Sequence, residues 1–287
     1  MHRRPNRRRR RALTLVELLV TIALITVVAT LGYFALGTFA GPSNVANGVD
    51  RLSGWLLIAK QRAKRDGVPT GIRISTDATG QIYSVVQYIQ QPDAFANGRC
   101  TATTTSMATF AFTGGNNFKA SGLPDILPGD YLELNGGPLH QITGVSANTL
   151  TVATATLPAN PNLLSTAGSL PNYRIIRQPR LIDGEEPMNL PGTVGVDPTK
   201  STPPSSTISP GSYDILFAPS GAVIGQGTPS GQIYLWVRDM TANTATDIKA
   251  GYGTIIAIQV RSGTISSQPV GPASDPYQFT RDARGGM

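Results

Sequence analysis

The sequence is poor in the residue types that most often carry catalysis or bind metal ions. Its 287 residues include one cysteine, Cys100, and two histidines, His2 and His140. A single cysteine excludes an internal disulfide framework and a cysteine-based zinc site. The sequence contains no Gly-x-Ser-x-Gly nucleophile elbow, no Walker A motif and no Gly-x-Gly-x-x-Gly phosphate cradle. We therefore predict that the protein is not an enzyme and has neither a cofactor nor a metal site.

Charge is also scarce, and the basic excess is confined to one end. Charged residues make up 14% of the chain, and the formal net charge is +7. Seven of the 24 Lys and Arg residues lie within residues 1–12, which contain no Asp or Glu, so 17 basic residues face 17 acidic ones in the remainder. The basicity therefore indicates a leader at 1–12 and not a broad binding surface for nucleic acid.

A mostly apolar run, from Leu18 to Leu36, follows the basic leader. As a helix it would span about 28 Å, close to the ~30 Å hydrocarbon core of a bilayer. The arginine block should stay in the cytoplasm by the positive-inside rule, so everything after residue 40 should face outward. An isolated carboxylate, Glu17, stands at the edge of this run and needs a partner there, because an unpaired charge in a membrane segment is costly.

The residues around this carboxylate, Arg11-Ala12-Leu13-Thr14-Leu15-Val16-Glu17, resemble the class III signal of type IV prepilins and pseudopilins. The resemblance implies that prepilin peptidase cuts between Ala12 and Leu13 and that Leu13 becomes N-methylated. Ala12 stands where the family usually has Gly, and Leu13 where it usually has Phe. The resemblance also implies an assembly role for Glu17, which would neutralise the N-terminal amine of a neighbouring subunit. The alternative is a carboxylate that snorkels to the membrane interface.

A second helical segment is expected at 43–66. Gly41-Pro42 should interrupt or bend the helix, with Ser43 as a plausible N-cap and Gly67 as the C-cap. One apolar stripe at helical spacing consists of Val45, Val49, Leu52, Leu56, Ala59 and Ala63. Four basic residues lie outside this stripe: Lys60, Arg62, Lys64 and Arg65. Such a cluster is usually a solvated helix face, and the alternative is a face that binds nucleic acid.

Strand signals dominate after residue 67. A hairpin is expected from the turn residues 77–80 between two runs of strand-forming residues, and alternation in the run Gln232–Arg238 indicates a half-buried strand. The expected strands are Thr70–Thr76, Gln81–Ile89, Tyr131–Leu134, Leu139–Thr143, Leu150–Ala155, Tyr213–Phe217, Gln232–Arg238 and Thr254–Val260.

Two stretches, LLIAKQRAKRDGVPTGIRI and ILFAPSGAVIG with the strands after it, resemble FimT/GspH-type minor pilins over 13–90 and 173–265. The implied fold class is α+β, a type IV pilin-like fold with a long N-terminal helix, transmembrane and then amphipathic, packed on an antiparallel β-sheet head. The divisions are a leader at 1–12, a transmembrane or filament-core helix at 13–40, the second half-helix at 43–66, and a head at 67–265. A β-rich insertion is expected at 91–172, and a flexible tail at 266–287.

The function that follows is that of a minor structural subunit of a type IV pilus or of a type II secretion pseudopilus. Its partners would be other pilin or pseudopilin subunits, prepilin peptidase and the lipid of the bacterial inner membrane, which it would cross once. The alternatives are a pilin-like binding module for DNA or surfaces and an ordinary single-pass membrane protein. DNA binding would use Arg281 and Arg284 in the tail, or Arg174, Arg177 and Arg180 if these converge.

Overall fold

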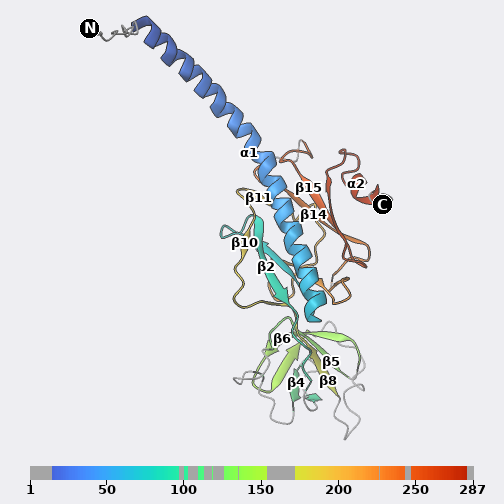
Figure 1. Ribbon diagram of the computed structural model, residues 1–287. Helices are drawn as coiled ribbons and strands as arrows, with labels where there is room; N and C mark the ends of the chain where they lie inside the picture. Colours follow the sequence, from blue (N-terminus) through green and yellow to red (C-terminus); the bar gives the residue numbers. More distant parts are fainter. Residues whose placement is uncertain are drawn as a thin grey trace, which may run out of the picture.

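The computed structural model describes residues 15–96, 100–102, 109–112, 118, 126–134, 136–153, 172–225, 227–242 and 247–282. A long helix projects from a head that contains two antiparallel sheets and a short C-terminal helix (Figure 1). This arrangement agrees with the α+β class expected from the sequence. The N-terminal half of the helix stands clear of the head, and its C-terminal half crosses the large sheet.

Helix α1 runs without interruption from Leu15 to Asp66, with Pro42 inside it. Gly41-Pro42 therefore does not break the helix, and Ser43 is not an N-cap but an interior residue. Pro42 has no N–H for an intrahelical hydrogen bond and costs the helix stability, but the helix continues through it. The predicted C-cap is confirmed, because Gly67 has φ +70° and its N–H donates to the carbonyl of Ala63 at 3.1 Å.

The apolar stripe of α1 is buried as predicted. All six side chains are at most 4% exposed, and they pack with residues of the large sheet into one core. Opposite them lie Ile72 and Ile74 from the first strand and Leu235 and Val237 from a later one. Because each fully buried Leu or Val contributes about 1.5–3 kcal/mol, this stripe holds the helix to the head.

The large sheet has the order β13-β12-β1-β2-β11-β14-β15-β16, with β9 and β10 also paired to β2. The predicted hairpin is confirmed, because β1 and β2 pair around a turn in which Gly80 has φ +73°. The bounds are β1 Thr70–Thr76, β2 Tyr83–Gln90, β9 Arg180–Leu181, β10 Met188–Asn189, β11 Val194–Val196, β12 Tyr213–Phe217, β13 Val223–Ile224, β14 Gln232–Asp239, β15 Thr254–Gln259 and β16 Ile265–Pro269.

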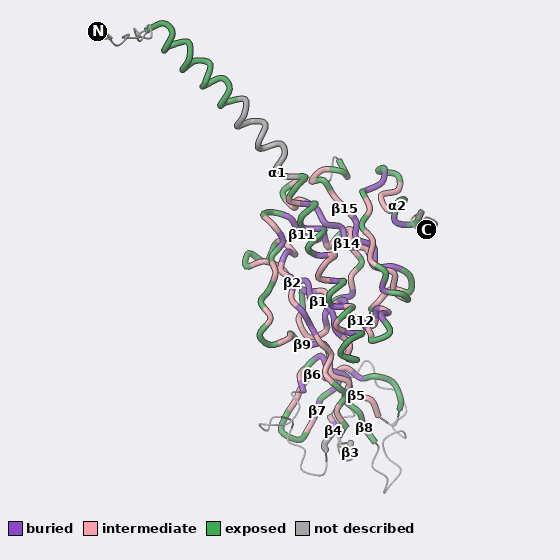
Figure 2. The backbone as a smooth tube through the Cα atoms, viewed as in Figure 1, coloured by how far each residue is buried: buried purple, intermediate pink, exposed green. Residues whose placement is uncertain are grey.

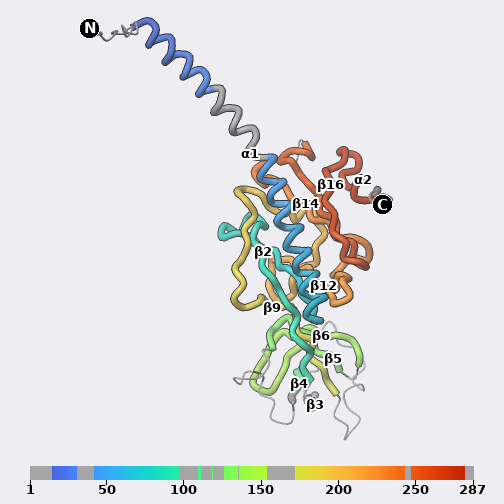
Figure 3. The backbone as a smooth tube through the Cα atoms, in the orientation of Figure 1, coloured from blue at the N-terminus to red at the C-terminus, as the bar shows by residue number. Residues whose placement is uncertain are grey.

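The small sheet has the order β3-β4-β7-β6-β5-β8 and lies at the end of the head farthest from the N-terminus of α1 (Figure 3). It has its own core, with Phe110, Leu132 and Ile175 at its centre. Its strands are β3 Cys100–Ala102, β4 Thr109–Phe112, β5 Tyr131–Leu134, β6 Leu139–Val145, β7 Thr149–Val152 and β8 Tyr173–Ile176.

The buried carboxylate of Asp130 joins the small sheet to the large one. It accepts hydrogen bonds from the backbone N–H of Leu127 and Gln178 at 2.9 and 2.8 Å, and from the guanidinium of Arg180 at 2.7 Å. Burial raises the pKa of Asp130 above its ordinary value, although these donors favour the charged form. The preceding residue, Gly129, has φ +100°, and a Cβ there would lie 2.7 Å from the carbonyl oxygen of Thr207. Position 129 therefore requires glycine, because the Cβ of any other residue would clash with the carbonyl oxygen of Thr207.

The C-terminal segment differs from its prediction. Instead of a flexible tail after Ile265, the chain adds β16 to the sheet edge and forms helix α2, Gln278–Asp282. Val270 and Tyr277 pack against Trp236, which is fully buried on the sheet face opposite α1. Strand β14 is therefore covered on both faces and is not the half-buried strand that its alternation predicts.

A buried ion pair at the end of β14 gives the head a predictable pH dependence. Arg238 donates to the carboxylate of Asp197 at 2.8 Å, and Thr199 donates to it through its hydroxyl and its N–H. Burial opposes ionisation of Asp197, but these hydrogen bonds outweigh it and hold its pKa below the ordinary 3.8. The pair therefore stabilises the fold fully above pH 3.8, and this contribution is lost as the pH falls through the lowered pKa of the folded state.

We expect Asp197→Asn to remove this part of the pH dependence. Urea unfolding between pH 7 and pH 3 should show a smaller acid loss of the free energy of unfolding in the variant than in the wild type, with the curves converging below pH 3.8. Asp183→Asn, at an exposed carboxylate, is the control and should follow the wild-type curve. Parallel curves for Asp197→Asn and wild type would contradict the assignment.

Candidate assembly site

The projecting part of α1 presents apolar side chains on every side. Residues 15–30 are all exposed (Figure 2), including Leu15 at 80% and Val28 at 65%. A helix that is apolar around its whole circumference is normally covered, either by protein or by lipid. This segment is therefore the part of the described chain with the greatest need for a partner.

Among the residues that the structure describes, no helix has both the length and the apolar character required of a membrane span. The transmembrane segment expected over 18–36 is accordingly not confirmed.

Glu17 lies in the first turn of α1 and is exposed. A carboxylate there is favoured by the positive end of the helix dipole. The other residues of 15–30 are apolar except for Thr21, Thr26 and Thr30, so Glu17 is the one charged group on this part of the helix. Ala12 and Leu13, the residues of the expected cleavage site, lie outside the described residues.

Four of the arginines considered for DNA binding make contacts within the chain. Arg174 pairs with Glu133 at 2.6 Å, and Arg177 donates to the carbonyl of Asp93 at 2.8 Å. Arg180 is the residue that pairs with Asp130. In the C-terminal segment Arg281 pairs with Asp275, and Arg284 lies outside the described residues.

Two of the basic residues on the second half of α1 are also engaged, so the interpretation as a solvated face is wrong for them. The ammonium group of Lys60 donates to the carbonyls of Ser262 and Gly263 at 2.9 and 2.8 Å. Arg62 pairs with Glu185 at 2.7 Å and lies over the ring of Tyr88. These contacts fix the helix to the head.

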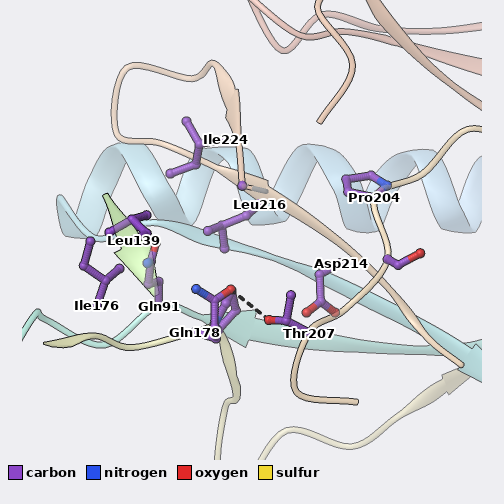
Figure 4. Close-up of a pocket in the computed structure, with 12 residues that line it drawn as sticks. Gln91, Leu139, Ile176, Gln178, Pro204, Thr207, Asp214, Leu216 and Ile224 are labelled. Carbon is purple, nitrogen blue, oxygen red and sulfur yellow. Dashed lines mark hydrogen bonds between the residues drawn. The ribbon is translucent and has the colours of Figure 1, made fainter. Parts of the chain in front are cut away.

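A cavity of about 190 Å³ lies where the two sheets meet (Figure 4). Its apolar lining includes Leu139, Ile176, Leu216 and Ile224. Its polar groups are largely satisfied by the protein: Thr207 donates to Gln178 at 3.2 Å, Gln91 donates to the carbonyl of Arg177 at 3.0 Å, and Arg73 engages both oxygens of Asp214. The cavity is thus a small apolar space and not an arrangement of free acid–base groups.

The remaining residues with reactive side chains are dispersed. His140 is buried in β6, and Cys100 lies in β3. Over the described ranges, no three His, Cys, Asp or Glu side chains gather closely enough to hold a metal ion.

Sequence reasoning missed one surface on the second half of α1. Leu57 and Ile58 are 49% and 42% exposed, although they lie between the buried residues Leu56 and Ala59. The signal was available, because helical spacing that assigns the stripe to the core also turns Gly54, Leu57 and Ile58 away from it.

Comparison with known proteins gives one partial match. No curated protein and no solved structure matches the chain. A family model described as the prokaryotic N-terminal methylation motif matches residues 7–33. This range contains the expected cleavage site, Glu17 and the start of the projecting helix. The match indicates a prepilin-type N-terminus, of the kind that prepilin peptidase processes and that assembles with other pilin subunits.

Proposed function

We propose that the protein is a non-enzymatic minor subunit of a type IV pilus or type II secretion pseudopilus, related to FimT/GspH-like pilins. Prepilin peptidase cuts the precursor between Ala12 and Leu13, and Leu13 is N-methylated. The mature chain is anchored once in the inner membrane, with its head outside the cytoplasm, and then enters a filament through its N-terminal helix.

The observation that carries this proposal is the combination of the methylation motif at 7–33 with a helix that leaves residues 15–30 uncovered. A conventional signal sequence is removed together with its apolar core. Cleavage before Leu13 would instead keep the apolar helix in the mature chain, where it needs a membrane or other subunits around it. The head in turn offers a rigid, well-packed body on the second half of the same helix.

The first test is the intact mass and N-terminal sequence of the protein from native membranes. A mature chain that starts at N-methyl-Leu13 is expected. A chain that retains the arginine leader, in cells with active prepilin peptidase, would contradict the proposal.

The second test concerns Glu17. We expect Glu17→Ala to be processed normally but to enter filaments at least tenfold less than the wild type, because the new N-terminal amine of a neighbouring subunit loses its counter-charge. Quantitative immunoblotting of sheared filaments against membranes measures the ratio. Asp50→Ala, at another exposed acid on α1, is the control and should assemble normally. Equal assembly of both variants would remove Glu17 from the mechanism.

A further inference from the structure

The cavity where the two sheets meet has walls from both of them. Leu139 and Ile176 come from β6 and β8 of the small sheet, and Leu216 and Ile224 come from β12 and β13 of the large one (Figure 4). Leu216 is only 3% exposed but points away from the core beneath α1, because strand residues alternate and its neighbour Ile215 belongs to that core. The cavity therefore exists only because the small sheet meets the large one.

The size of the cavity limits what it can hold. It measures about 190 Å³, whereas an apolar cavity of about 150 Å³ engineered in another protein holds benzene. Pockets for drug-sized ligands are larger, at roughly 300–1,000 Å³. The side chains of Leu139, Ile176 and Ile224 are each partly exposed, so the space can be reached from solvent. The cavity therefore has room for a single ring with one short substituent.

The charge in the lining is cancelled within the protein. Asp214 is the one charged residue that lines the cavity in the described part of the chain. Both of its carboxylate oxygens accept hydrogen bonds from Arg73, at 2.6 and 2.7 Å. A cation would therefore find no free carboxylate in this lining, and an anion would find no free basic group. Because burying an unpaired charge is costly, the lining favours an uncharged ligand.

Two glutamine side chains in the lining each use only half of their amide group. Nε2 of Gln91 donates to the carbonyl of Arg177 at 3.0 Å, and its Oε1 has no partner among the described residues. Oε1 of Gln178 accepts from the hydroxyl of Thr207 at 3.2 Å. Nε2 of Gln178 lies on the side away from Thr207 (Figure 4) and has no partner in the described ranges either. The cavity thus offers one acceptor and one donor beside its apolar walls, which is the complement of a carboxamide.

We propose that this cavity binds a small uncharged molecule that carries one carboxamide or lactam group on an apolar ring. The ring packs against the four apolar side chains, its carbonyl accepts from Nε2 of Gln178, and its N–H donates to Oε1 of Gln91. The site lies in the head and does not depend on the proposed function in a filament. It gives the small sheet a role of its own, as one wall of a binding site.

Titration of the full chain in detergent with benzamide tests the site. In NMR spectra of isoleucine methyl groups, the signals of Ile176 and Ile224 should shift and saturate. The signal of Ile215, on the opposite face of β12, should not move. Benzoate and benzylammonium carry the same ring with a charge, and they should bind at least tenfold more weakly than benzamide because the lining cannot neutralise them. The absence of a saturable shift, or equal affinities for the three compounds, would overturn the proposal.

A cavity-filling variant locates the binding. Leu139→Trp places a larger side chain at the rim and should lower the affinity for benzamide at least tenfold. Leu181→Trp, at an exposed leucine of β9 outside the lining, is the matched control and should bind as the wild type does. The thermal midpoint of each ligand-free variant shows whether the head is folded. Undiminished binding by Leu139→Trp would also overturn the proposal.

A second variant tests the amide contact and separates it from folding. Gln178→Met removes the free donor but keeps the backbone N–H that donates to Asp130. The affinity for benzamide should fall at least tenfold, whereas that for toluene, which has the ring without the amide, should change less than twofold. Gln81→Met, at an exposed glutamine in the β1–β2 turn, should change neither. Equal losses for both ligands, or no loss for either, would overturn the proposal.

Discussion

Replacing Leu56 by alanine is expected to lower the free energy of unfolding by about 2–5 kcal/mol. Leu56 is completely buried at the centre of the stripe that joins α1 to the large sheet. Alanine would leave a cavity that the surrounding strands cannot fill, because β1 and β14 are fixed in register by their neighbours on both sides. Because this stripe holds the helix on the head, the substitution should destabilise the whole head and not α1 alone.

The adjacent Leu57 provides a matched control. It has the same side chain and the same helical backbone but is 49% exposed. Leu57→Ala should change the free energy of unfolding by no more than about 0.5 kcal/mol. Urea titrations of the two full-length variants in the same detergent give the comparison directly. Similar losses in both would show that the burial described for the stripe does not hold.

Replacing Arg73 by alanine should be equally damaging, at about 3–5 kcal/mol. Arg73 on β1 makes two hydrogen bonds to Asp214 on β12, at 2.6 and 2.7 Å, and a third to the carbonyl of Pro179 at 3.1 Å. Both side chains of the ion pair are about one-tenth exposed. Alanine would leave the carboxylate of Asp214 buried without its counter-charge, which costs far more than the net value of the pair.

The control for this prediction is Arg174→Ala. Its pair with Glu133 has the same N–O distance as that of Arg73, at 2.6 Å, but the arginine side chain is 54% exposed. Solvent screening should reduce its loss to about 0–1 kcal/mol. Replacing Arg73 and Asp214 together by Met and Leu should recover much of the loss, because no buried charge remains. Equal losses for the two arginine variants would argue against the burial of the Arg73–Asp214 pair.

Local patterns in the sequence were sufficient where a single element determines its own structure. The spacing of the α1 stripe predicts its buried face, and the turn at 77–80 predicts the β1–β2 hairpin. Gly67 predicts the helix end, and several strands were predicted to within a residue or two. In each of these cases the signal lies within a few neighbouring residues, so no knowledge of distant contacts is needed.

Contacts between distant segments account for the errors. The alternation in β14 indicates a half-buried strand, because nothing near Trp236 in sequence shows that Val270 and Tyr277 cover it. The same contact explains why 266–282 contains ordered elements despite its lack of periodicity. For the candidate site, the sequence identifies Glu17 and the apolar segment 15–30. It does not identify the groove lined by Gly54 and Leu57 on α1 and by 263–265, because that groove exists only where the β15–β16 hairpin lies beside the helix.

The way the small sheet joins the large one has a consequence for how such heads can diversify. Ile89 pairs with Leu181 and Gln90 with Arg180, so the chain leaves β2 and returns to it at neighbouring points of one antiparallel ladder. A tight turn could close this gap, and any compact module whose own termini lie close together could replace the present one. Helix α1 would not have to adjust, whereas Arg180 on the large sheet would need another partner in place of Asp130. The small sheet at the distal end of the head can therefore be exchanged for another module without any change in the helix.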